Sequence, residues 1–184
     1  MTAFIVVIVL LVLVAILIIS IYNSLVSLRN KVKNSWSQID VELQRRFDLI
    51  PNLVETVKGY MDHEEAVLTK VTELRTSWSN ASSISEKAAL DNELSNSVKS
   101  IMAVAENYPD LKANTNFLSL QEELSNTENK LSSSRNTYNN VTTAYNTKIE
   151  MFPSNIVANL FGFKQEELFK VESEEAKQNV KVQF

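Results

Sequence analysis

The residues best suited to metal chemistry surround the single histidine of the chain. His63 stands in the run Asp62-His63-Glu64-Glu65, and imidazole and carboxylate groups are ligands that zinc accepts. A zinc site needs at least two further ligands that converge, and the second histidine four residues on, typical of zinc-protease helices, is missing. We therefore interpret this run as an acidic helix start, and the sequence predicts no metal site.

Three pairs of adjacent glutamates are the remaining candidates for acid–base chemistry. They are Glu122-Glu123, Glu166-Glu167 and Glu174-Glu175. Neighbouring side chains on a helix diverge and so do not share one pocket. Gly59 and Gly162 are the only glycines, too few for a phosphate-binding loop, and there is no cysteine. The sequence predicts no catalytic residue, no cofactor and no enzymatic activity; a hydrolase with a hidden cleft is the least favoured alternative.

Composition limits the elements that could position any site. A chain of 184 residues allows one domain, or one domain with an appendage. Two glycines and three prolines leave too little turn material for a β-sandwich or a doubly wound sheet, so the chain should be mostly helical. The formal net charge of −4 argues against a non-specific nucleic-acid partner.

The amino-terminal residues form an uninterrupted apolar run. From Phe4 to Ile19 every residue except Ala15 is Val, Ile, Leu or Phe, and the run reaches Tyr22 with only Ser20 as a polar interruption. As a helix it would span roughly 30 Å, the thickness of a bilayer's hydrocarbon core. No polar face is present, which argues against a buried core helix. The anchor residues that we single out are Phe4, Ile8, Leu11, Ile16 and Tyr22.

The residues that flank this run indicate an uncleaved, oriented anchor. No basic side chain precedes it and no small-residue cleavage site follows it, unlike a signal peptide. Arg29, Lys31 and Lys33 follow it before the first acidic residue, Asp40. By the positive-inside rule we expect a single pass through the cell membrane, with the bulk of the chain cytoplasmic.

Apolar residues recur at steps of three and four after the anchor, as on one face of a helix. Pro51 predicts a break at Ile50-Pro51, and Pro109 predicts the end of a later helix. The stripes run through residues 25–50, 54–78, 84–108 and 117–152. The predicted fold is all-α: a single transmembrane helix followed by an elongated antiparallel bundle of about four helices.

Three capping signatures mark predicted helix starts, each with a short polar residue three positions before a glutamate. They are Asn52 with Glu55, Ser83 with Glu86, and Ser119 with Glu122, although the apolar pattern of the last helix already begins at Phe117.

Other residues support packing within that bundle. Arg45 and Arg46 have the spacing of ordinary surface ion pairs with Glu42 and Asp48. A seven-residue repeat forms a coiled-coil-like seam that is too polar to stand alone, so it should pack on neighbouring helices. Its members are Phe117, Leu124, Leu131, Tyr138, Tyr145 and Phe152.

The carboxyl-terminal region divides into a short apolar stretch and a tail. The stretch from Ile156 to Phe163 should dock on the bundle, with contact to the lipid interface as the alternative. Val180, Val182 and Phe184 alternate with polar residues, which fits a disordered tail or a strand added to another chain. We expect three parts: an anchor at 1–22, a bundle at 23–151, and an amphipathic segment with its tail at 152–184.

Large aromatic residues are the candidates for contacts with other proteins. Trp36 and Trp78 lie at helical spacing among aliphatic residues, so core packing is the favoured interpretation and a contact surface is the alternative. With Phe161, Phe163 and Phe184 they make up the candidate interaction surface.

Blocks of sequence along the whole chain after the anchor resemble the signature blocks of the LemA family. They are YNSLV (22–26), WSQIDV (36–41), RRFDLIPNLV (45–54), VKGY (57–60), YPDLKA (108–113), EEL (122–124), TEN (127–129), FPSN (152–155) and LFGF (160–163). The resemblance implies a bacterial or archaeal single-pass membrane protein with a helical domain assigned to the cytoplasm. It implies no established enzymatic activity, no catalytic residues, and roles in envelope maintenance or membrane stress, sometimes alongside a membrane metalloprotease.

The favoured hypothesis is a non-enzymatic, membrane-anchored interaction or scaffold protein of the cell envelope. Its expected partners are membrane lipid, a second copy of itself, and a membrane protease or other envelope protein. The alternative is an adaptor or regulator of a membrane-bound metalloprotease.

Overall fold

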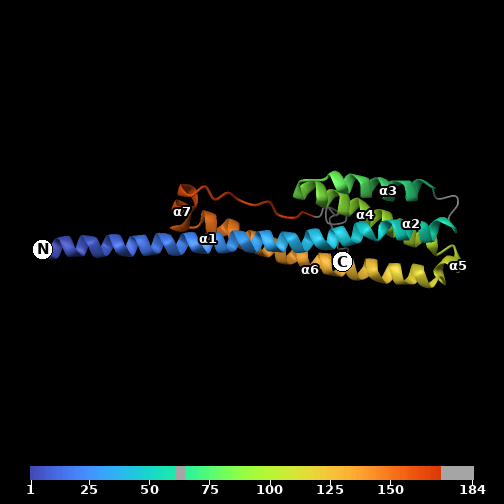
Figure 1. Cartoon of the computed structure of the whole chain (residues 1–184), viewed down its shortest axis with the longest axis horizontal. Helices are drawn as coiled ribbons and strands as arrows, with labels where there is room; N and C mark the ends of the chain where they lie inside the picture. Colours follow the sequence, from blue (N-terminus) through green and yellow to red (C-terminus); the bar gives the residue numbers. More distant parts are fainter. Residues whose placement is uncertain (61–64, 171–184) are drawn as a thin grey trace, which may run out of the picture. The chain divides into compact units, whose positions relative to one another are not determined.

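The computed structural model describes residues 1–60 and 65–170 and is all-helical over these residues, with no strand among them (Figure 1). The helices are α1 (Thr2–Asp48), α2 (Ile50–Lys58), α3 (Glu65–Asn80), α4 (Ile84–Ala105), α5 (Pro109–Lys112), α6 (Thr115–Glu150) and α7 (Ser154–Leu160). The predicted fold class, a long apolar helix followed by further helices, is confirmed.

The chain forms two compact units. The first unit contains residues 1–38 and 134–168, and the second contains residues 39–133 with the described residues 169 and 170. Helices α1 and α6 each contribute residues to both units. The predicted division at residues 22 and 151 stays a prediction.

In the first unit, α1 changes character sharply near Ile21. Nearly every residue before it is exposed, whereas Ile21, Leu25 and Val32 are buried. The core that surrounds these residues is built from α6, α7 and the segment after α7. Its members include Tyr138, Tyr145, Ile149, Val157, Ala158 and Phe163. Among the described residues the apolar run is thus largely uncovered by protein, and packing starts where the run ends.

In the second unit, α3 packs on α4, α2 contacts α3, and α5 contacts α4. Only three residues join α3 to α4, so the two helices are antiparallel neighbours, as Figure 1 shows. The core is aliphatic and aromatic. It includes Leu43, Phe47, Leu53, Val57, Val71, Leu94, Ile101, Leu111 and Phe117.

The break at the first proline occurs one residue earlier than predicted. Helix α1 ends at Asp48 and α2 begins at Ile50, so Leu49 alone lies between them. Pro51 lies in the first turn of α2. Backbone amides in the first turn of a helix have no helical carbonyl to donate to, so the amide hydrogen that proline lacks costs no hydrogen bond there. The capping box predicted at Asn52 is wrong: Leu49 precedes α2, and no side chain caps it.

The start of α6 also differs from its prediction. The helix begins at Thr115, a full turn before Ser119. The Asn114 side-chain oxygen accepts hydrogen bonds from the backbone amides of Asn116 and Phe117, at 2.9 and 3.2 Å. An Asx cap at the end of the short loop after α5 therefore starts the helix before the serine signature is reached.

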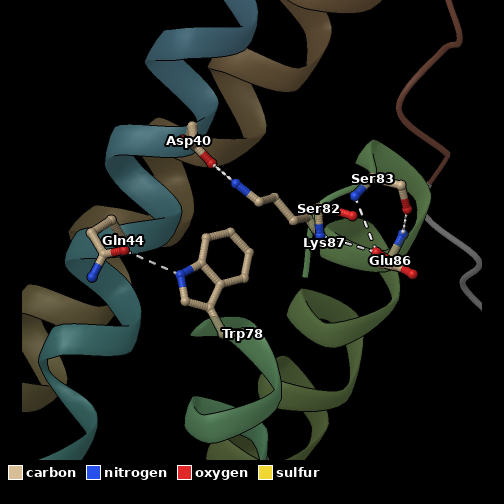
Figure 2. Close-up of polar contacts among 7 residues, drawn as sticks. All are labelled: Asp40, Gln44, Trp78, Ser82, Ser83, Glu86 and Lys87. Atoms are coloured by element: carbon tan, nitrogen blue, oxygen red, sulfur yellow. Dashed lines mark hydrogen bonds and ion pairs between the residues drawn. The ribbon is translucent and has the colours of Figure 1, made fainter. Parts of the chain in front are cut away.

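The Ser83 capping box at the start of α4 is confirmed (Figure 2). The Ser83 hydroxyl accepts from the Glu86 amide at 3.1 Å, and the Glu86 carboxylate accepts from the Ser83 amide at 3.1 Å. We expect Ser83→Ala to lower the free energy of unfolding by about 1 kcal/mol, because one amide of the first turn loses its acceptor. Chemical denaturation checks this, with Ser125→Ala, an exposed serine in the middle of α6, as the control; equal stability of the two variants would contradict it.

The same cap makes stability depend on pH in a defined direction. Hydrogen bonds from the Ser83 backbone, then the Ser82 backbone, then the Ser83 side chain lower the pKa of Glu86. Because folding lowers this pKa, the carboxylate stabilises the folded state above its unfolded-state pKa, and the stabilisation disappears as pH falls through the folded-state value. Glu86→Gln should therefore be less stable than the parent at neutral pH and equal to it in strong acid. Thermal melts over that range test this, and a constant difference at all pH values would refute it.

Candidate functional site

The end of the apolar run is marked by a cluster of aromatic rings in the first unit. The Tyr22 ring lies 4.8 Å from the Phe161 ring and 5.7 Å from the Phe163 ring, measured between centroids. The Arg29 guanidinium lies 5.0 Å from the centre of the Phe163 ring, a cation–π contact. We call these four residues the aromatic cluster. Three of them were singled out from the sequence, and the structure brings these three together.

The local fold after α7 explains why the two phenylalanines face different ways. Gly162 has a φ of +69°, a left-handed conformation that favours glycine. The Phe163 amide donates to the Ala158 carbonyl at 2.9 Å and the Gly162 amide donates to Asn159 at 3.3 Å, the two bonds of a Schellman motif. The chain reverses at this point, which buries Phe163 and leaves Phe161 about half exposed.

The segment after the motif is held on α6 by side-chain hydrogen bonds. The Asn146 amide side chain donates to the Glu166 carbonyl at 2.8 Å and accepts from the Glu166 amide at 3.0 Å. The Tyr138 hydroxyl donates to the Glu167 carbonyl at 2.7 Å. Burial raises the pKa of the Tyr138 hydroxyl, so it remains a donor across the physiological range. These bonds position α7 and the aromatic cluster.

The junction between α6 and α7 is also tied locally. The Ser154 hydroxyl is buried and lies 2.6 Å from the Lys148 carbonyl and 2.9 Å from the Met151 carbonyl. The Met151 carbonyl already accepts from the Asn155 amide at 2.8 Å, so the hydroxyl matters most for the Lys148 carbonyl in the last turn of α6. Hydrogen bonds before and after α7 therefore hold this short helix at the end of the apolar run.

Of the two tryptophans, Trp36 belongs to the first unit. It is half-buried, and its ring lies 5.7 Å from the Tyr138 ring in an edge-on arrangement.

Trp78 belongs to the second unit and lies in its core. It is 6% exposed, and its ring stacks on Phe47 with the centroids 4.6 Å apart. Figure 2 shows its indole nitrogen donating to the Gln44 side-chain oxygen at 3.2 Å, while Lys87 reaches across to Asp40. The Lys87 ammonium also lies 4.8 Å from the centre of the indole ring. Trp78 therefore offers little surface to a partner.

A buried ion cluster in the second unit was missed by the sequence interpretation. Arg46 is 3% exposed and Asp91 is fully buried; an Arg46 guanidinium nitrogen lies 2.8 Å from an Asp91 oxygen and also pairs with Glu128. The expectation of a surface pair is wrong for Arg46. Arg45 is at the surface as expected, but its ion pair, at 4.0 Å, is with Glu123 and not with Glu42 or Asp48.

A signal for this cluster was present in the sequence. Arg46 falls three residues after Leu43 and four before Ile50, on the apolar stripe of its helix. Asp91 falls three residues after Ala88 and three before Leu94, on the stripe of α4. Two opposite charges on apolar stripes predict a buried pair, because a charge is rarely buried without a partner.

Candidate metal ligands and an open hollow are the other features of the described residues that bear on a chemical site. Within residues 1–60 and 65–170 no three His, Cys, Asp or Glu side chains come together to hold a metal ion. An open hollow of the second unit is lined by Asn52, Glu55, Thr56, Asn114 and Ser119 among others. Glu55 is the one ionisable group in that lining, which includes no histidine or lysine. His63 and Phe184 lie outside the described residues.

Comparisons with known proteins identify related sequences. The model of the LemA family matches residues 35–184. Protein LemA of Metamycoplasma hominis is 31% identical over 140 residues, which cover 74% of this chain and 63% of that protein. Magnetosome protein MamQ 2 of Paramagnetospirillum magneticum is 26% identical over 175 residues, covering 81% of this chain and 64% of that protein.

A third relative has the same extent. Magnetosome protein MamQ of Magnetospirillum gryphiswaldense is 24% identical over 174 residues, covering 80% of this chain and 64% of that protein. The matches thus span a little under two thirds of the length of these curated relatives. With the family model matching residues 35–184 and the resemblance carried by the motif blocks, the chain belongs to the LemA family.

Proposed function

We propose that this protein is a non-enzymatic, membrane-anchored interaction protein that serves as a scaffold in the cell envelope. The observation that carries the proposal is the contrast within α1. One helix is long and apolar enough to cross a membrane, and its most apolar window has no residue buried against protein. The same helix then enters a packed core from Ile21 onward. Such a helix can hold a folded unit at a bilayer surface.

The proposed orientation places the bulk of the chain in the cytoplasm. Arg29, Lys31 and Lys33 lie on α1 shortly after the apolar run. Basic residues near the end of a membrane helix favour the cytoplasmic side.

A binding role rather than catalysis is supported by the way charged groups are used. The buried charges Arg46 and Asp91 pair with each other, and Lys87 pairs with Asp40. These charges join segments of the second unit that lie far apart in the chain. Proteins with the names LemA and magnetosome protein MamQ are both similar in sequence to this chain. The different names favour a common scaffold used in different settings, and they favour it more than a single conserved reaction.

Topology is tested with an epitope placed after Phe184. In intact spheroplasts treated with protease the epitope should survive, and it should be digested once the membrane is permeabilised. The protein should also stay with membranes washed in alkaline carbonate. Digestion in intact spheroplasts would reverse the proposed orientation, and release by carbonate would exclude a transmembrane anchor.

The scaffold role includes association with a second copy or with other envelope proteins. Size-exclusion chromatography with light scattering, on the full chain in mild detergent, should give a mass larger than one chain or a captured partner. A strictly monomeric protein without a partner would contradict the scaffold role. The alternative role, regulation of a membrane metalloprotease, is favoured if a reading frame for such a protease adjoins this gene.

A further inference from the structure

A patch of exposed apolar side chains lies on and around α7, at the end of the apolar run. Phe152 is 79% exposed and Leu160 is 73% exposed, and their neighbours are more than half exposed. We name this patch the apolar cap; its members are Met151, Phe152, Ile156, Leu160 and Phe161. Monomeric soluble proteins seldom leave such groups uncovered together, so the cap needs an apolar environment.

Both faces of α7 carry apolar residues, but only one face is packed. Val157 and Ala158 are buried in the core of the first unit, and Ile156 and Leu160 point away from it. Phe152 continues the seven-residue seam of α6, whose members Tyr138 and Tyr145 in the same unit are buried, yet Phe152 is not. The exposed side chains of the apolar cap therefore do not contribute to the core of the first unit.

The position of the cap along α1 identifies its environment. From Phe4 to Tyr22 the helix rises about 27 Å, so an anchor that starts near Phe4 brings Tyr22 to the edge of the hydrocarbon core. Tyrosine is typical of this interface. The Phe161 ring lies 4.8 Å from the Tyr22 ring, which places this part of the cap at the same depth.

We propose that the apolar cap inserts into the interfacial layer of the same bilayer that α1 crosses, so that α7 acts as a second, shallow membrane contact. The proposal rests on the anchor proposed above. The occupant is lipid because the cap adjoins the exposed apolar run through the Tyr22–Phe161 contact, so one continuous apolar surface serves both. A second membrane contact would restrain rotation and tilt of the first unit about α1.

The absence of cysteine from the chain permits a direct test. Single cysteines replace Asn159, Val12 and Val41 in separate full-length proteins and carry an NBD fluorophore. Each protein is reconstituted into phosphatidylcholine–phosphatidylglycerol vesicles with nitroxides either shallow or deep on the acyl chains. Asn159 is an exposed polar position of α7, so the label reports on the cap without replacing one of its members. Val41 is 65% exposed in the second unit and serves as the matched aqueous control.

The fluorescence emission of the label at Asn159 should be blue-shifted relative to that of the label at Val41. Shallow nitroxides should quench the Asn159 label several-fold more than the Val41 label. The label at Val12 should be quenched by deep nitroxides. Adding Leu160→Asp and Phe161→Asp to the Asn159→Cys protein should abolish quenching at that site and leave the Val12 result unchanged. Retained quenching in this variant would overturn the role of the cap.

The remaining outcomes separate the possibilities. A label at Asn159 that behaves like the one at Val41, while Val12 is quenched, would overturn the cap proposal and leave the anchor intact. If the emission of the label at Asn159 is blue-shifted but no lipid nitroxide quenches it, the proposed lipid contact is overturned. That result would favour a second protein chain that covers the cap. An unquenched label at Val12 would overturn the anchor and the cap together.

Discussion

Replacing Asp91 with alanine is expected to destabilise the second unit by about 3 kcal/mol. The substitution removes the Asp91 carboxylate from the buried Arg46 guanidinium, which then keeps its ion pair with Glu128, whose side chain is 40% exposed. Breaking a buried ion pair typically costs about 3 to 5 kcal/mol, and the Glu128 contact puts the expected cost at the lower end. Denaturant titration of the full chain in mild detergent, followed by circular dichroism, gives the change in the free energy of unfolding.

Two further variants decide whether the cost comes from burial of the charge. Glu123→Ala removes the exposed partner of Arg45 and should cost less than about 0.5 kcal/mol. Arg46→Met combined with Asp91→Leu removes both buried charges and should recover most of the lost stability. If Asp91→Ala were no more harmful than Glu123→Ala, the buried cluster would not contribute as the structure indicates.

The second large effect concerns the anchor. Leu11→Arg combined with Leu13→Arg should release most of the protein from carbonate-washed membranes. Each leucine-to-arginine change near the centre of a membrane helix shifts the insertion free energy by about 3 to 4 kcal/mol. Two such changes are comparable with the whole favourable insertion energy of the run, about 5 to 10 kcal/mol when its aliphatic residues are summed on the same scale.

The matched control is Val41→Arg with Leu118→Arg, two exposed apolar residues of the second unit. This variant should fractionate with membranes as the parent does. Retention of the Leu11→Arg, Leu13→Arg protein in washed membranes would show that residues other than the apolar run hold the chain there. Immunoblotting of the membrane and soluble fractions provides the measurement.

Membership of the LemA family was recognisable from the motif blocks alone, and the family model agrees.

Local signals in the sequence determined the apolar run, the all-helical fold and the Ser83 capping box. Each depends on residues within a few turns of one another, because helical period, hydrophobicity and capping act over three or four positions. The same locality explains why the Ser119 signature does not start α6: Ser119 lies inside the helix, because Asn114 caps it one turn earlier.

The tertiary structure alone decided which partners meet. That Arg46 reaches Asp91, 45 residues away, depends on how α4 packs against the end of α1 in the second unit. That Phe163 is buried while Phe161 is exposed depends on the chain reversal at Gly162 and on the hydrogen bonds of the following segment to α6. Periodicity identifies a face of a helix, but the residue that covers that face is set by packing between segments far apart in the chain.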